Sequence, residues 1–141
     1  MSHHVIEMPD LGIGTFRLEG KTAYNSVKMA LDIGFRHIDT AQIYGNEEHV
    51  GKAIKDSSVP RSEIFITTKV WNDKLNSAQF IESVKQSLEK LQLDYVDLLL
   101  IHWPSASNGE KMSEYLTELK KVKELGLAKH IGVSNFTIAN L

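Results

Sequence analysis

Hydrophobic and polar positions along the chain follow two periods in turn. Short runs rich in apolar and β-branched residues are separated by longer stretches in which apolar residues recur every three or four positions. The short runs are typical of buried strands, and the longer stretches are typical of amphipathic helices. Regular alternation of the two predicts an α/β protein with a parallel sheet built from βαβ units.

The pattern predicts five strands. The expected strands are residues 11–14, 35–41, 64–70, 96–101 and 131–133. The run 96–101 is almost entirely apolar, which is typical of a strand that is buried on both faces.

Four helices are expected between these strands. Their apolar stripes are Ala23, Val27, Ala30 and Leu31; Val50, Ala53 and Ile54; Ile81, Val84, Leu88 and Leu91; and Met112, Tyr115, Leu116, Leu119 and Val122. Gly34 and Gly126 stand where a glycine commonly follows a helix. Asn46 is expected to cap the second helix, with Glu47 favourably placed in its first turn, and Ser77 is expected to cap the third.

Polar residues follow successive strands at intervals of about 30 residues, which is the length of one βα step. They are Asp39, Lys69, His102 and Ser134. Both an open doubly wound sheet and part of a (β/α)8 barrel fit this spacing. The dinucleotide fingerprint of the open sheet fails here, because Arg17 stands at its third glycine position. A barrel instead gathers functional side chains from the C-terminal ends of several strands, so we expect a barrel.

Composition excludes several classes of protein. The chain has 141 residues, 16 Lys+Arg against 18 Asp+Glu, and no cysteine. It therefore lacks the basic excess typical of nucleic-acid binding, and it can form neither a disulfide nor a thiolate metal site. No apolar run approaches the roughly 18 residues of a membrane span, and the amino terminus has no secretory pattern. We therefore expect a cytoplasmic protein. We also expect no metal, since the histidines other than His102 lack the spacing of metal ligands.

The strand-end residues, taken with Tyr44, suit the reduction of a carbonyl. A tyrosine is a weak acid at neutral pH unless a nearby cation strengthens it, and Lys69 could supply that cation. Asp39 would keep the lysine charged, and His102 could form a hydrogen bond with the substrate carbonyl. The same residues also fit proton abstraction or, with an unprotonated Lys69, Schiff-base chemistry.

Four motifs look like those of the aldo-keto reductases. They are D-T-A-Q-I-Y-G-N-E at 39–47, T-K-V-W at 68–71, L-I-H-W-P at 100–104 and I-G-V-S-N-F at 131–136. Together with G-I-G-T-F at 12–16 they occur in the family's order and cover essentially the whole chain. Their wording is similar to the branch that reduces 2,5-diketo-D-gluconate or methylglyoxal.

The resemblance implies a (β/α)8 barrel that binds NADPH (NADP when oxidised) and passes hydride to a small aldehyde or ketone. It implies Tyr44 as the general acid, Lys69 and Asp39 as its supporting pair, and His102 as the residue that orients the carbonyl. The implied cofactor residues are Gly14, Thr15, Asp39, Ser134 and Asn135. The implied substrate residues are Phe16, Tyr44, Trp71, His102 and Trp103.

The length of the chain suggests a partial barrel. A full barrel takes about 250 residues, whereas about five strands are expected here. We therefore expect residues 1–141 to be the N-terminal portion of a single barrel domain from a longer enzyme. An open arc of strands would have two unpaired edges, so self-association is expected. Two alternatives are an inactive half-barrel that acts through self-association and a Schiff-base lyase, which Asp39 beside Lys69 disfavours.

Overall fold

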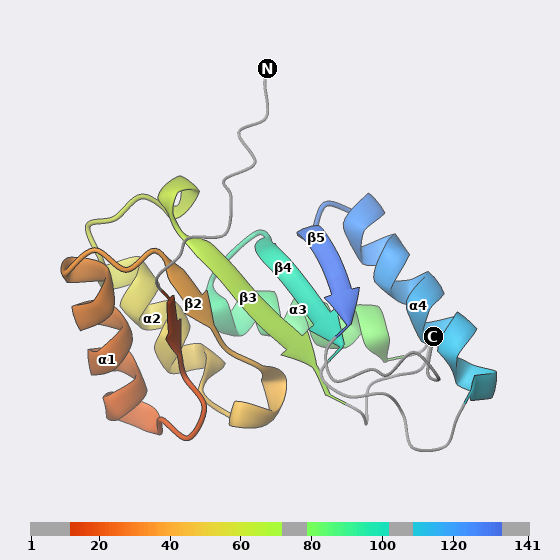
Figure 1. Cartoon of the computed structure of the whole chain (residues 1–141), viewed down its shortest axis with the longest axis horizontal. Helices are drawn as coiled ribbons and strands as arrows, with labels where there is room; N and C mark the ends of the chain where they lie inside the picture. The colour runs from red at the N-terminus through yellow and green to blue at the C-terminus, as the bar shows by residue number, and fades with distance from the viewer. Residues whose placement is uncertain (1–11, 72–78, 102–108, 134–141) are drawn as a thin grey trace.

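Five parallel strands form one curved sheet, and their order in the sheet is their order in the chain (Figure 1). The computed structural model describes residues 12–71, 79–101 and 109–133. The strands are β1 (Gly12–Gly14), β2 (His37–Asp39), β3 (Phe65–Val70), β4 (Val96–Ile101) and β5 (Ala128–Val133). Because every neighbouring pair is parallel, the C-terminal ends of the strands meet at one edge of the sheet.

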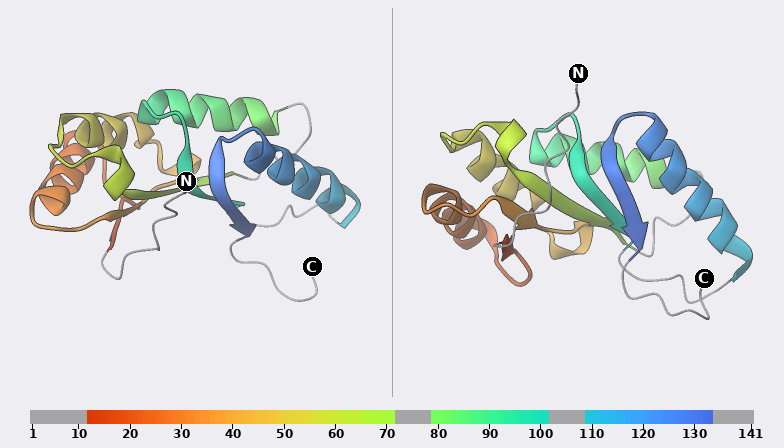
Figure 2. Two further views of the ribbon diagram at one scale, coloured as in Figure 1. Left: turned by 90° about the horizontal axis from the view of Figure 1, so that it is seen from above. Right: turned by 45° about the horizontal axis from the view of Figure 1, so that its top comes forward.

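A helix follows each of the first four strands. The helices are α1 (Gly20–Asp32), α2 (Glu47–Asp56), α3 (Phe80–Leu91) and α4 (Gly109–Glu124), with short 3₁₀ turns η1 (Gln42–Tyr44) and η2 (Arg61–Glu63). All four lie along one face of the sheet (Figure 2). This arrangement of five strands and four helices confirms the expected partial (β/α)8 barrel.

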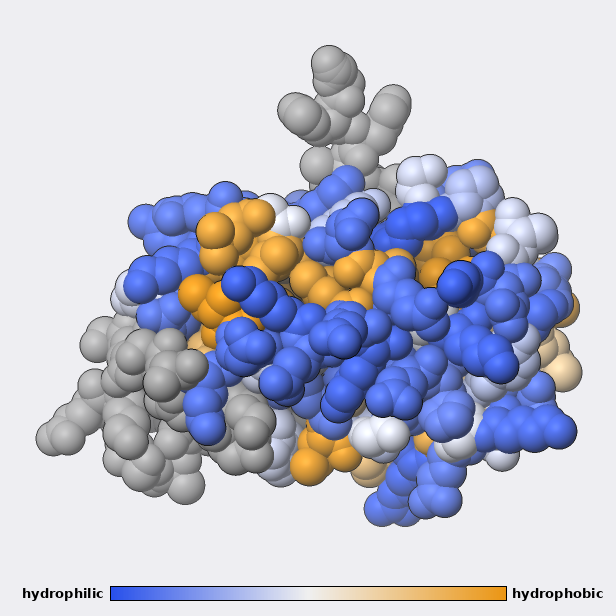
Figure 3. All heavy atoms as spheres, turned by 180° about the vertical axis from the view of Figure 1, so that it is seen from behind, coloured by the Kyte–Doolittle hydropathy of each residue, from blue (hydrophilic) through white to orange (hydrophobic). Residues whose placement is uncertain are grey.

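The hydrophobic core lies between the sheet and the helices. The expected stripes of α1 and α2 are buried in full, as are Val84, Leu88 and Leu91 of α3. They pack against strand residues whose side chains point the same way, among them Ile38, Ile66 and Leu99. The outer surface of the helices, seen from behind in Figure 3, is mostly hydrophilic, with separate hydrophobic areas. Amphipathic periodicity thus placed the core on the correct side of α1, α2 and α3, although Ile81 of the expected α3 stripe is only half-buried.

Burial on both faces of 96–101 was expected, and the structure shows alternation along part of this strand instead. Leu99 and Ile101 are fully buried under the helices, whereas Leu98 and Leu100 are half-buried. Since side chains alternate along a strand, these two leucines lie on the face opposite the helices. Leu100 pairs in register with Lys69 of β3. Apolar residues therefore line the same sheet face as this lysine.

Several element boundaries differ from those expected. Strand β2 is shorter, because the chain turns into η1 soon after Asp39. Strand β5 begins three residues earlier, at Ala128, because its backbone pairs with β4 before the apolar run begins. Helix α3 begins at Phe80, while the expected cap Ser77 lies outside the described residues. Among the described residues, none of the helices has the length and apolar character needed to cross a bilayer.

Candidate active site

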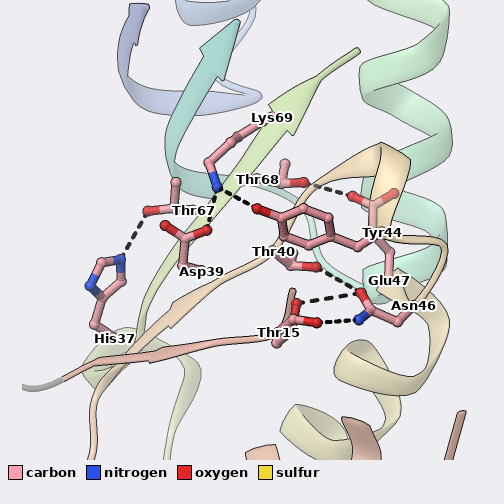
Figure 4. A network of polar contacts seen from close by, with 10 residues as sticks. All are labelled: Thr15, His37, Asp39, Thr40, Tyr44, Asn46, Glu47, Thr67, Thr68 and Lys69. Atoms are coloured by element: carbon pink, nitrogen blue, oxygen red, sulfur yellow. Dashed lines mark hydrogen bonds and ion pairs between the residues drawn. The ribbon is translucent and has the colours of Figure 1, made fainter. Parts of the chain in front are cut away.

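Asp39, Tyr44 and Lys69 come together at the C-terminal edge of the sheet (Figure 4). Asp39 ends β2, Lys69 is the penultimate residue of β3, and Tyr44 ends η1. The Lys69 Nζ donates to Asp39 Oδ1 at 2.5 Å and to Tyr44 Oη at 3.2 Å. The lysine thus bridges the carboxylate and the phenol, and three of the four expected catalytic residues are adjacent.

Burial makes this ion pair different from one on the surface. The side chain of Lys69 is 10% exposed, whereas that of Asp39 is 36% exposed. A buried ammonium group is costly unless a counter-charge and hydrogen-bond acceptors compensate for lost water, and Asp39 and Tyr44 provide them. The Lys69 Nζ also lies 5.2 Å from the centroid of the Tyr44 ring. Positive charge is therefore held against the phenol, and the exposed part of Asp39 remains accessible.

The turn η1 presents Tyr44 to the lysine. The Thr40 amide still bonds to Thr67 O of β3 at 2.8 Å, and the Tyr44 amide then bonds back to Ala41 O at 3.1 Å. Gly45 follows with a φ of +68°, a left-handed conformation that glycine adopts without steric cost. The short turn therefore ends at Tyr44, and α2 begins three residues later, at Glu47.

Asn46 holds the β1–α1 loop against this turn. Its Nδ2 donates to Thr15 O and Leu18 O, both at 2.8 Å. Its Oδ1 accepts from Thr40 Oγ1 at 3.0 Å and from Thr15 Oγ1 at 3.4 Å. Asn46 does occupy the N-cap position of α2, but its side chain makes no cap hydrogen bond. The expected side-chain cap is therefore wrong, because the amide bonds to distant segments instead.

The β1–α1 loop brings Phe16 over the phenol. The rings of Phe16 and Tyr44 lie 5.3 Å apart, and Phe16 is 60% exposed. Thr15 is buried, with its hydroxyl turned to Asn46, and space is open beside the Cα of Gly14. Half-buried Trp71 directly follows β3. Phe16 therefore packs beside the phenol of Tyr44, and Trp71 directly follows the strand that carries Lys69.

Glu47 is a buried carboxyl group one residue after Asn46. It accepts a hydrogen bond from Thr68 Oγ1 at 2.7 Å and another from Ser87 Oγ at 3.1 Å. Burial raises the pKa of Glu47 above its ordinary value, and the two hydroxyl hydrogen bonds oppose that shift. The sequence indicated only a favourable position in the first turn of a helix. The one signal in the sequence was that Glu47 precedes the buried stripe of α2, where an acidic side chain needs a polar partner.

His37 lies beneath the cluster on the sheet face opposite the helices. Its Nε2 is 3.1 Å from Thr67 Oγ1, and its ring meets Phe65 edge-on at 5.3 Å. Burial lowers the pKa of His37, which favours the neutral imidazole. A Cβ on Gly12 would come within 2.8 Å of this ring. His37 therefore packs against Gly12, Phe65 and Thr67 on this face of the sheet, a role that its position in the sequence did not indicate.

The remaining predicted site residues lie outside the described part of the chain. They are His102, Trp103, Ser134 and Asn135. Within residues 12–71, 79–101 and 109–133, no group of three potential metal-ligating side chains comes together.

The fold and the cluster define a barrel protein with a charged, tyrosine-containing site at the C-terminal ends of its strands. The aldo/keto reductase family matches residues 10–141. The chain belongs to that family.

Individual relatives agree with this assignment. The chain is 51% identical over 131 residues to methylglyoxal reductase DkgB of Salmonella typhi, covering 93% of this chain and 49% of the relative. It is 47% identical over 140 residues to glyoxal reductase of Bacillus subtilis, covering 99% and 50% of the two proteins. The chain thus spans about half the length of these curated relatives.

Solved structures give the same picture. An aldo/keto reductase of Brucella melitensis superposes with a TM-score of 0.89 at 47% identity, covering 94% of this chain and 52% of that one. An aldose reductase of Schistosoma japonicum superposes with a TM-score of 0.86 at 31% identity, covering 94% and 51%.

Proposed function

We propose that the chain carries the acid-base residues of an NADPH-dependent reductase acting on small aldehydes and ketones of the methylglyoxal or 2,5-diketo-D-gluconate type. The observation that carries this proposal is the Lys69 ammonium group, which bridges Asp39 and Tyr44. The relatives named as methylglyoxal and glyoxal reductases support the substrate class.

In this proposal, Tyr44 is the proton donor. A carbonyl oxygen within hydrogen-bond distance of Tyr44 Oη gains negative charge as the carbonyl carbon is reduced, and the phenol transfers its proton to that oxygen. The phenolate that remains is stabilised by the ammonium group of Lys69, whose charge is balanced by Asp39. NADPH, when bound, supplies the hydride, so the products are an alcohol and the oxidised cofactor. His102 would orient the carbonyl.

The described residues fit a cofactor beside this cluster. Gly14 leaves open space next to the exposed part of Asp39, since strands β1 and β2 pair these two residues directly. Thr15 would contribute backbone contacts, because its hydroxyl is bonded to Asn46. Ser134 and Asn135 would complete the cofactor contacts. Phe16 and Trp71, with Trp103, would form the apolar walls of the substrate pocket.

We also propose that residues 1–141 correspond to the N-terminal portion of one barrel domain. The order of the five strands and the half-length match to relatives support this. We further propose self-association through the sheet, because β1 and β5 are the edge strands of its described part. The Schiff-base alternative is disfavoured, since the Lys69 Nζ is already hydrogen-bonded to both Asp39 and Tyr44.

The test is a comparison of Tyr44→Phe with Tyr24→Phe and the wild-type chain. Tyr24 lies on α1, where its hydroxyl donates to Asp56 Oδ2 at 2.6 Å, away from the cluster. NADPH oxidation is measured with methylglyoxal as substrate. We expect Tyr44→Phe to lower kcat by about 100-fold or more at nearly unchanged cofactor affinity, while Tyr24→Phe keeps the wild-type rate. Equal rates for the two variants would overturn the role of Tyr44, whereas an inactive wild-type chain would assign the activity to the longer enzyme of which this chain is a portion.

A further inference from the structure

The residues on either side of Tyr44 are hydrogen-bonded to residues on either side of Lys69. These contacts form a polar ring, made of Gln42, Glu47, Thr68, Trp71 and Ser87. Glu47 accepts from Thr68 Oγ1 at 2.7 Å and from Ser87 Oγ at 3.1 Å. Gln42 Nε2 donates to Ser87 Oγ at 3.3 Å, and Gln42 Oε1 accepts from the Trp71 amide at 3.0 Å. The backbone of β3 between Thr68 and Trp71 closes the ring.

The geometry of the ring suits the task of holding Tyr44 beside Lys69. The two residues are 25 positions apart in the chain, and their hydrogen bond is 3.2 Å long. Tyr44 belongs to a three-residue 3₁₀ turn, a short element with few hydrogen bonds of its own. The polar ring attaches this turn at both ends, through Gln42 and Glu47, to the strand that carries the lysine. Movement of Tyr44 away from Lys69 would therefore strain or break ring contacts.

Burial makes these contacts costly to break. Glu47, Thr68 and Ser87 are 3%, 1% and 2% exposed. Water therefore has little access to replace a lost partner, and an unsatisfied buried group is destabilising. Ser87 adds a second support, because helix α3 anchors it independently of the turn and the strand. Three elements are thus fixed relative to one another around the acid and the lysine.

We propose that Glu47, acting with Gln42 and Ser87, is a positioning residue that keeps Tyr44 within hydrogen-bond distance of Lys69. It acts through Thr68 and Ser87, to which its carboxyl group is bonded. The role in catalysis rests on the proposed reductase function, whereas the role in geometry can be measured without turnover.

Four variants separate positioning from general stability. Glu47→Met keeps the length of the side chain but removes its hydrogen bonds, whereas Glu47→Gln retains an acceptor oxygen. Ser87→Ala removes one hydroxyl from the ring. Ser83→Ala is the matched control, since this serine lies one turn earlier on α3, is similarly buried, and donates to Phe80 O of its own helix at 2.8 Å.

The first readout is NMR on the purified full chain. The NOE between the Tyr44 ring and the Lys69 ε-methylene reports their proximity, and exchange of the Trp71 amide reports its bond to Gln42. We expect Glu47→Met and Ser87→Ala to weaken the NOE and to speed the amide exchange by about tenfold. Glu47→Gln and Ser83→Ala should retain both signals. A folded Glu47→Met with the full NOE would overturn the proposal.

The second readout is kinetic. We expect Glu47→Met to lower kcat on the order of 10- to 100-fold with little change in KM, because the reacting groups are misplaced rather than the substrate released. The same change made in a Lys69→Met background should have little further effect, since the pair no longer exists. An equal loss in both backgrounds would indicate destabilisation and contradict positioning.

The outcomes for the two proposals are distinct. If Tyr44→Phe reduces methylglyoxal as fast as Tyr24→Phe, the proposed function fails, while the NOE comparison still decides whether the polar ring holds Tyr44. If Glu47→Met does not fold, Ser87→Ala decides against Ser83→Ala, because both remove one buried hydroxyl from the same helix.

Discussion

The hydrogen bonds of Asn46 stabilise a strained backbone conformation in the β1–α1 loop. Arg17 in this loop has a φ of +64°, a left-handed conformation that costs a non-glycine residue about 1–2 kcal/mol. The carbonyl of the next residue, Leu18, accepts from Asn46, as does that of Thr15. The Leu18 amide also bonds to Thr15 O at 3.1 Å, which closes the loop. The side-chain amide of Asn46 therefore stabilises the strained turn formed by residues 15–18. Phe16, which packs against Tyr44, belongs to this turn.

We expect Asn46→Asp to destabilise the folded chain by about 3 kcal/mol at neutral pH. The substitution places a carboxylate oxygen where Nδ2 now donates to two carbonyl oxygens at 2.8 Å, in a residue that is 1% exposed. Urea unfolding followed by circular dichroism measures the change. Asn25→Asp on the exposed side of α1 adds the same charge and should shift stability by less than about 0.5 kcal/mol. Similar losses in both variants would show that Asn46 has no special role.

The sequence predicted the approach of Asp39 to Lys69, because parallel strands bring their C-terminal ends together. It did not predict the partners of Asn46 and Glu47. Both residues have the local pattern of a helix start, whereas their hydrogen bonds reach the β1–α1 loop, β3 and α3. Such partners depend on how elements pack, which no local pattern specifies.

Helices α2 and α3 approach each other closely at one point. A Cβ on Gly51 of α2 would lie 2.6 Å from backbone atoms of Leu91 at the end of α3. The absence of a side chain therefore sets the separation of the two helices. Glu47 lies one turn before Gly51, and Ser87 lies one turn before Leu91. The spacing at Gly51 thus contributes to the 3.1 Å contact between Glu47 and Ser87.

We expect Gly51→Ala to lower the free energy of unfolding by about 1–3 kcal/mol through overpacking. Alanine has the higher helix propensity, by roughly 1 kcal/mol, so propensity alone would make this variant more stable than wild type. A loss of stability would therefore report the steric conflict with Leu91. Lys55→Ala, at an exposed position on the same helix, is the control and should be close to neutral. Urea unfolding of the three proteins gives the comparison. A Gly51→Ala protein more stable than wild type would contradict the close approach.

Apolar periodicity predicted the elements well and their ends less well. The stripe of α1 is buried at all four expected positions, because one face of an amphipathic helix must meet the core. The start of β5 was missed by three residues. Lys129 and His130 carry no apolar signal, yet His130 pairs with Leu98 of β4 through the backbone ladder. Backbone pairing continues past the apolar residues, so hydropathy alone underestimates a strand.

The two faces of the sheet differ in what packs against them. Helices α1 to α4 lie along one face, as Figure 2 shows, while Leu98 and Leu100 lie half-buried on the other. Within the described residues, β1 and β5 each pair with a single neighbouring strand. Unpaired strand edges and a partly exposed apolar face both favour association, the edge through backbone hydrogen bonds and the face through burial of apolar area.

We therefore expect the 141-residue chain to associate with itself in a concentration-dependent manner. Sedimentation velocity over a range of protein concentrations measures this, and Leu98→Lys should shift the equilibrium toward monomer by placing a charge on the sheet face opposite the helices. Leu125→Lys is the matched control, because Leu125 is a 58% exposed leucine that follows α4. If association used any exposed apolar residue, the two lysine variants would behave alike. If the wild-type chain remained monomeric at every concentration, the sheet would need no second copy, and the self-association proposal would be wrong.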